Sequence, residues 1–147
     1  MWDGGVSVEG LKKFWKENWL TLTVVLVLAG AYVFLRTPGD VFASVEELEA
    51  QLQSGSPTIV SFYSNSCSIC LIAKPRVDQL EASLEGRATV LRLNVNDAVG
   101  RTLATRWGVR GVPTFFVVNG RGEVVYAQAG APQVAVLEDL VVQLLQE

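Results

Sequence analysis

Hydrophobic and polar positions follow two different patterns along this chain. Residues 20–35 form one continuous run without a charged side chain. After residue 40, short apolar segments alternate with turn-forming residues, which is typical of helices and strands in one folded unit. The pattern predicts helices over residues 44–53, 68–84, 97–106 and 132–145, and strands over residues 58–63, 89–94, 114–118 and 123–128.

Local signals support these elements. Ser44 and Glu47 form a capping box at the start of one helix, and Pro75 should kink the helix that follows residue 67. Strand 58–63 has an apolar centre, which favours the middle of a sheet. Asn119 and Gly120 predict a hairpin turn before the last strand. Helices that alternate with strands predict an α/β domain whose sheet is covered on both faces.

The uncharged run near the N-terminus predicts a single transmembrane helix over residues 19–36. The run itself is slightly shorter than the roughly 20 residues that a bilayer span needs. Trp19 at one end, and Tyr32 with Arg36 at the other, would extend it by anchoring at the two interfaces. The remaining predicted parts are an interfacial segment (residues 1–18), a turn-rich linker (residues 37–42) and the folded domain (residues 43–147).

A cleaved signal peptide is the alternative interpretation of the same run. Lys12, Lys13 and Lys16 would be its basic region, and the small residues at positions 29–31 would be its cleavage site. The apolar run continues beyond that site to residue 35, which favours a retained anchor. Because three lysines precede the span and only Arg36 follows it closely, the N-terminus is predicted in the cytoplasm and the folded domain outside it.

Composition removes several classes of function. The chain has 147 residues, a net charge of -3, two cysteines and no histidine. The negative balance gives no electrostatic support to nucleic-acid binding. Two cysteines without histidine cannot supply the four ligands of a structural zinc site or an iron–sulfur cluster, so no metal site is predicted. Chemistry in this chain must therefore come from thiols, carboxylates or amines.

Cys67 and Cys70 are the candidate reactive residues. They follow the strand over residues 58–63 and fall in the first turn of the next predicted helix. The N–H groups and partial positive charge at a helix N-terminus favour a thiolate at Cys67, and Cys70 lies one turn later on the same face. This arrangement predicts a redox-active pair. An inert disulfide or two inert thiols remain the alternatives, although closing so short a loop would constrain the unfolded chain very little.

Residues 41–147 resemble the thioredoxin family. The helix and strand order, the Cys-x-x-Cys spacing and Pro75 five residues after Cys70 all match that family. The segments 93–96 (Leu-Asn-Val-Asn) and 107–114 (Trp-Gly-Val-Arg-Gly-Val-Pro-Thr) are similar to two further thioredoxin motifs. The resemblance implies a thioredoxin fold, with a central mixed sheet flanked by helices.

The resemblance also implies a role for individual residues. Cys67 would be the exposed attacking thiol and Cys70 the buried resolving thiol, with their disulfide as the only redox group and no separate cofactor. Pro113 would be a cis-proline beside the pair, and the backbone of Val112 would bind the client chain. Trp107 would either shape the client groove or pack the end of a helix.

Five residues depart from the thioredoxin pattern. Ser66 stands where the family has Trp, and Ser68 with Ile69 replaces Gly-Pro between the cysteines. Ser61 stands where a buried Asp helps to take the proton of the resolving thiol, and Asn96 replaces another Asp. We expect slower resolution by Cys70 and a redox potential unlike that of a general thioredoxin.

The arginines allow two interpretations. Arg92 would either lie near the cysteine pair and lower a thiol pKa, or point into solvent. Arg101, Arg106 and Arg110 would form either a patch for an acidic partner or an ordinary solvated surface, and surface charges are usually of the second kind.

Together these features predict a membrane-tethered thiol–disulfide oxidoreductase that acts on extracytoplasmic protein disulfides, in the periplasm or an equivalent compartment. By family analogy the direction is reductive, as in cytochrome maturation, and a transmembrane thiol donor would supply the electrons. The alternative is a non-catalytic accessory subunit of a membrane complex that uses a thioredoxin-like domain for docking.

Overall fold

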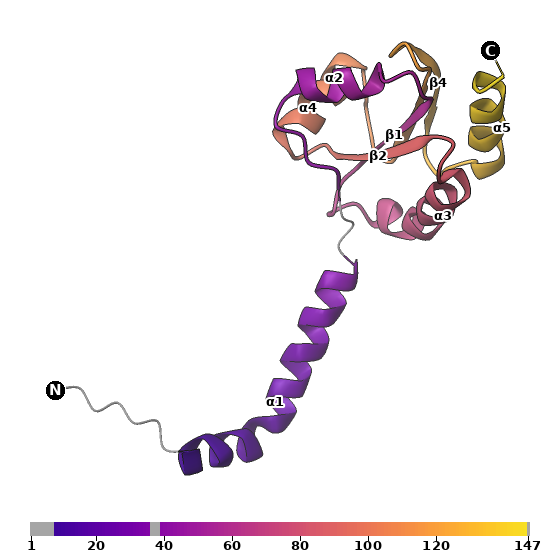
Figure 1. Ribbon diagram of the computed structural model, residues 1–147. Helices are drawn as coiled ribbons and strands as arrows, with labels where there is room; N and C mark the ends of the chain where they lie inside the picture. Colours follow the sequence, from indigo (N-terminus) through magenta and orange to yellow (C-terminus); the bar gives the residue numbers. More distant parts are fainter. Residues whose placement is uncertain (1–7, 36–38, 147) are drawn as a thin grey trace. The chain divides into compact units, whose positions relative to one another are not determined.

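The structure is a computed structural model that describes residues 8–35 and 39–146 (Figure 1). The chain forms two compact units, Met1–Arg36 and Thr37–Glu147. Among the sequence predictions, those for residues 1–7, Arg36 and residues 37–38 lie outside the described residues, as do those for the side chains of residues 8–16.

Within its described residues, the first unit forms one helix, α1 (Val8–Leu35), of 28 residues. Its segment Glu17–Phe34 is long and apolar enough to cross a membrane, a criterion that both a membrane anchor and a signal sequence meet. Trp19, Leu26 and Phe34 are among the large apolar side chains that this helix exposes. The helix is therefore suited to an apolar environment rather than to water.

The second unit is built on a four-stranded sheet in the order β2-β1-β3-β4. The strands are β1 (Thr58–Tyr63), β2 (Thr89–Asn94), β3 (Thr114–Val118) and β4 (Val124–Ala129). β1 runs parallel to β2 and antiparallel to β3, and β4 is antiparallel to β3. Every residue of β1 is buried, which confirms its central position.

Helices cover both faces of the sheet (Figure 1). On one face lie α2 (Val45–Leu52) and α4 (Ala98–Arg106), and on the other lie α3 (Ser68–Leu84) and α5 (Val134–Leu144). Side chains along each strand alternate between the two cores. Phe62 and Leu93 pack under α2 and α4, whereas Ile59 and Val90 pack under α3 and α5. The predicted mixed sheet flanked by helices is confirmed.

The element boundaries follow local chemistry. Ser44 Oγ accepts a hydrogen bond from the N–H of Glu47 (3.2 Å), and the N–H of Ala43 donates to Glu47 Oε2 (2.8 Å), so the capping box forms. The last helix begins at Val134 rather than at Pro132, because Gln133 is its N-cap and has a non-helical ψ of 83°. The prediction of Pro132 as the first helical residue is therefore wrong by two positions.

Candidate active site

Cys67 lies at the N-terminus of α3, four residues beyond the end of β1. It is the N-cap residue, with an extended backbone (φ -96°, ψ 111°), and its sulfur occupies the place that a Ser or Asp oxygen takes in an ordinary cap. The backbone N–H of Cys70 donates to Cys67 Sγ at 3.4 Å. The first turn of α3 thus directs N–H groups at a half-buried sulfur.

The two thiols have opposite pKa shifts. Burial alone would raise the pKa of Cys67, but hydrogen bonds from the Cys70 thiol and from the N–H groups of Cys70 and Ile69 outweigh it, so the pKa is lowered. Cys70 is only 6% exposed. Burial, followed by its hydrogen bond to Cys67, raises the pKa of Cys70 to about 11, although the Ser64 N–H acts in the opposite direction. Cys67 is therefore the better nucleophile at neutral pH.

The loop before β3 closes the site on the other side. The Val112–Pro113 peptide bond is cis, as the resemblance implies, and the Cys67 thiol donates to the carbonyl oxygen of Val112 at 3.5 Å. The Thr114 hydroxyl donates to the carbonyl oxygen of Gly111 (2.7 Å), and the Gly130 N–H donates to that of Pro113 (2.9 Å). The structure thus brings Cys67, Cys70, Val112 and Pro113 together.

A serine cluster holds the turn that carries Cys67. The hydroxyls of Ser64 and Ser66 are 2.9 Å apart, and Asn96 Nδ2 donates to Ser64 Oγ at 3.0 Å. The Cys67 N–H donates to the carbonyl oxygen of Ser64 at 3.2 Å. From the sequence, Ser66 was predicted only as a departure from the family, Asn96 as a departure or a possible helix cap, and Ser64 was missed. The polar run between an apolar strand and a cysteine was the signal that could have identified it.

A small cavity lies behind Cys70. Its volume is about 20 Å³, roughly enough for one water molecule, and its lining includes Ser61, Lys74, Arg92 and Pro113. No carboxylate lines it. Ser61 is 3% exposed and occupies the position of the family's buried Asp. The walls of this cavity therefore supply no carboxylate that could take the proton of Cys70.

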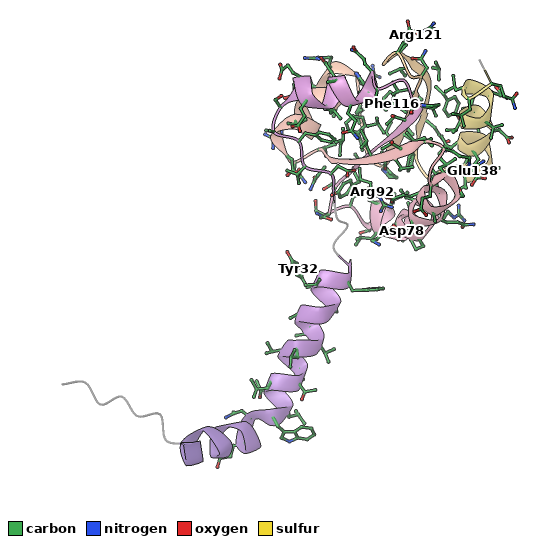
Figure 2. All side chains as sticks on the ribbon, viewed as in Figure 1. Tyr32, Asp78, Arg92, Phe116, Arg121 and Glu138 are labelled. Atoms are coloured by element: carbon green, nitrogen blue, oxygen red, sulfur yellow. The ribbon has the colours of Figure 1, made fainter. Side chains whose placement is uncertain are left out.

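Arg92 lies beside the same cavity but is paired elsewhere. Its guanidinium contacts Asp78 Oδ1 at 2.8 Å and Glu81 Oε2 at 2.5 Å, both on α3. Figure 2 labels Arg92 and Asp78, which lie close together between β2 and α3. Of the two interpretations of Arg92, the buried position near the cysteine pair is observed, whereas solvent exposure is not. Its charge is balanced by the two carboxylates, and it is not among the groups that shift either thiol pKa.

Trp107 lies at the end of α4 within an aromatic cluster. Its ring meets Phe116 at a centroid distance of 4.9 Å and Phe62 at 5.9 Å, both edge to face. It packs against the core under α2 and α4 while remaining partly exposed. This placement supports packing of the helix end, and a contact between Trp107 and a client stays a prediction.

Comparison with known proteins agrees with this geometry. A family model described as Thioredoxin matches residues 41–143. The chain belongs to the thioredoxin family. It is a thioredoxin-like thiol–disulfide oxidoreductase with a vicinal cysteine pair. The thioredoxin of Chlorobaculum thiosulfatiphilum is 32% identical to it over 80 residues, which cover 54% of this chain and 71% of that thioredoxin.

Two further relatives of this chain have names other than thioredoxin. The chloroplastic thioredoxin-like protein HCF164 of Arabidopsis thaliana is 28% identical over 108 residues, which cover 69% of this thioredoxin-like chain but only 41% of the relative. The thiol:disulfide interchange protein TxlA homolog of Synechocystis is 26% identical over 132 residues, covering 84% of this chain and 73% of that protein. Because the unit Thr37–Glu147 is only about three quarters of the chain, the second match extends into the N-terminal unit.

A solved thioredoxin-like structure supports the fold. It comes from work on the thiol resolving mechanism of a yeast mitochondrial 1-Cys peroxiredoxin, and it superposes with a TM-score of 0.60 at 17% sequence identity. The match covers 69% of this chain and 92% of the other.

Proposed function

We propose that this chain is a membrane-tethered enzyme that reduces disulfide bonds of extracytoplasmic proteins through Cys67 and Cys70. The observation that carries the proposal is the split between the two thiols. Cys67 has a lowered pKa at a helix N-terminus, and the buried Cys70 one turn later has a raised pKa. A nucleophilic thiol beside a protonated reserve thiol is the arrangement that thiol–disulfide exchange requires.

The reaction runs in two exchanges. The Cys67 thiolate attacks one sulfur of the client disulfide, a Cys67–client disulfide forms, and the other client sulfur leaves and takes a proton from water. Cys70 then attacks Cys67 Sγ, its proton passes to solvent or to the departing client sulfur, and the second client thiol is released. The client has gained two electrons, and Cys67 and Cys70 are left as a disulfide.

The backbone at Val112 and Pro113 would hold the client beside Cys67. The contact of 3.5 Å between Cys67 Sγ and the carbonyl oxygen of the half-buried Val112 supports this, because it joins the loop main chain to the reacting sulfur. An extended client segment could pair with that backbone, since main-chain hydrogen bonds bind chains of any sequence. Trp107 would contribute only through its exposed edge.

The membrane anchor and the reductive direction of the reaction are supported by other observations. The apolar helix α1 and the TxlA homolog match that extends into the N-terminal unit support a membrane anchor. By the positive-inside rule, the lysines before the span support a location of the folded domain outside the cytoplasm. Reduction in that compartment, of the kind that cytochrome maturation needs, requires a transmembrane thiol donor to return two electrons to the Cys67–Cys70 disulfide.

The test uses the full chain in detergent micelles. With dithiothreitol as the electron source, the wild type should reduce insulin disulfides, and Cys67→Ser should be inactive. Cys70→Ser should accumulate a disulfide adduct between Cys67 and the substrate that dithiothreitol releases. If the wild type reduces nothing and both thiols react equally slowly with iodoacetamide, the accessory docking function replaces the enzymatic one.

A further inference from the structure

A pocket of about 270 Å³ adjoins the active-site loop at Val112. Its apolar walls are Val95 after β2, Ala104 on α4, and Val109 with Val112 in the loop. Because Val112 also contacts Cys67 Sγ, the pocket lies next to the place where a client segment is held. A side chain of a client bound at Cys67 can therefore reach it.

Two arginines give this pocket its charge. Arg101 of α4 and Arg110 of the loop both line it, and both are exposed. Arg101 Nη2 donates to the carbonyl oxygen of Asn96 at 2.7 Å, which fixes its guanidinium near the start of α4. In the part of the chain that the structure describes, no carboxylate forms an ion pair with Arg101 or Arg110.

Three other arginines of the chain do form ion pairs with carboxylates. Arg92 pairs with Asp78 and Glu81, Arg106 pairs with Glu49, and Arg121 pairs with Glu123. The chain has more acidic than basic residues, 15 against 12. Two guanidiniums at one apolar pocket without a carboxylate therefore leave a local positive charge on an acidic protein, where a partner can neutralise it.

We propose that this pocket selects clients that carry an Asp or Glu close to the reacting cysteine. The client carboxylate would lie between Arg101 and Arg110, and the apolar walls would pack against its methylene groups. An extended chain rises about 3.3 Å per residue, so the acidic residue would lie within about three residues of the client cysteine. The inference rests on the proposed function and adds a substrate class to it.

The same pocket would act against basic clients. A Lys or Arg at that position would meet two like charges and gain no partner, so discrimination would come from repulsion as well as attraction. The selection would weaken at high salt, because both arginines are reached by solvent and their charges are screened.

The experiment uses peptides that contain one cysteine in a mixed disulfide with 2-nitro-5-thiobenzoate, whose release is coloured. Three series place Glu, Gln or Lys at each of the three positions on either side of the cysteine. The full chain in micelles should reduce the best Glu peptide about five- to tenfold faster than its Gln counterpart, and the Lys peptide more slowly still. The Arg101→Gln/Arg110→Gln double variant should bring the Glu-to-Gln ratio close to 1.

Arg106→Gln is the matched control, because Arg106 lies on the same helix but pairs with Glu49 outside the pocket. It should keep the wild-type preference. If the wild type reduces all peptides at one rate, or if the double variant keeps the preference, the pocket proposal is overturned and the proposed function stands. If no peptide is reduced at all, both are overturned.

Discussion

The backbone N–H of Cys70 donates to the sulfur of Cys67 at 3.4 Å, and the Cys70 thiol also contributes to the lowered pKa of Cys67. In the proposed reaction, the residue that resolves the mixed disulfide thus also activates the residue that forms it. Burial is the largest cause of the raised pKa of Cys70, and the hydrogen bond between the two thiols raises it further. The bond between the thiols therefore shifts the two pKa values in opposite directions.

Removing the Cys70 thiol should raise the pKa of Cys67. In Cys70→Ala the donor side chain is lost and only the backbone N–H groups remain, so the thiolate is less stabilised. Cys70→Ser keeps a hydroxyl donor and is the matched control. The measurement is the rate of iodoacetamide alkylation of Cys67 against pH, followed by mass spectrometry. The midpoint should lie at higher pH in Cys70→Ala than in Cys70→Ser, and an unchanged midpoint would rule out the thiol contribution.

Resolution by Cys70 should be slow at neutral pH and should accelerate in alkali. In the mixed disulfide Cys67 has no free thiol, but burial still raises the pKa of Cys70 and no carboxylate lines its cavity, so Cys70 stays protonated at pH 7. Its thiolate fraction, and with it the resolution rate, should rise about tenfold per pH unit between pH 7 and 9. Stopped-flow decay of a preformed Cys67 mixed disulfide measures this rate. A pH-independent rate would show that another group takes the proton.

Ser61→Asp should restore the missing proton acceptor. Ser61 lines the cavity behind Cys70, and a carboxylate there could accept the Cys70 proton, which should raise the resolution rate at pH 7 by about tenfold or more. Lys74 and Arg92 line the same cavity and would offset part of the cost of burying the new charge. Ser61→Asn is the control, because an asparagine side chain has nearly the same shape as aspartate but cannot act as a base. Equal rates in the Asp and Asn variants would exclude the base function.

Much of this fold could be predicted because its signals are local. The boundaries of β1, β2 and β3 follow from apolar runs that end in turn residues, and the cis-proline loop follows from one motif. Pro132 misled the prediction because proline suits the first helical position as well as the positions just before a helix. The domain boundaries at residues 18, 36 and 42 stay predictions.

The side chains around the site could not be predicted in the same way. Whether Arg92 points at α3 depends on Asp78 and Glu81, which lie on another element and form no motif with β2. Arg106 likewise differs from Arg101 and Arg110 because it forms an ion pair with Glu49 of α2. Tertiary packing determines which carboxylate each arginine contacts, and the residue pattern of a single segment gives no information about it.

Gly100→Ala should destabilise the domain by about 1–3 kcal/mol. A Cβ at Gly100 would lie 2.2 Å from the carbonyl oxygen of Asn94, so α4 must move away from the end of β2. Gly111→Ala is the control, since a Cβ there meets nothing within 4 Å. The free energy of unfolding in urea measures both. If both variants were equally stable, the close approach of α4 to β2 would be wrong.

The Arg92 cluster should make stability depend on pH in acid. Burial acts to raise the pKa of Asp78, but hydrogen bonds from Lys74 and Arg92 outweigh it and lower the pKa. The ionised carboxylate therefore stabilises the fold above its unfolded pKa, near 4, and this contribution is lost as the pH falls through the lower folded value. Asp78→Asn should cost about 0.5–1 kcal/mol at pH 6, since the side chain is 44% exposed, and little at pH 2. Asp139→Asn replaces an exposed aspartate on α5 and is the control variant.

The N-terminal helix should remain in the mature protein and hold the domain outside the cytoplasm. Leu26, Val27, Leu28, Val33 and Phe34 are all more than 60% exposed, so in water this helix would leave a large apolar surface uncovered. Retention predicts the mass of the uncleaved chain and resistance to alkaline extraction, whereas cleavage after position 31 would release a soluble domain. In intact cells a membrane-impermeant maleimide should label Cys67, because the lysines before the span predict a cytoplasmic N-terminus. Labelling only after lysis would show that the folded domain faces the cytoplasm. The client disulfides would then have to lie in that reducing compartment, where few persist.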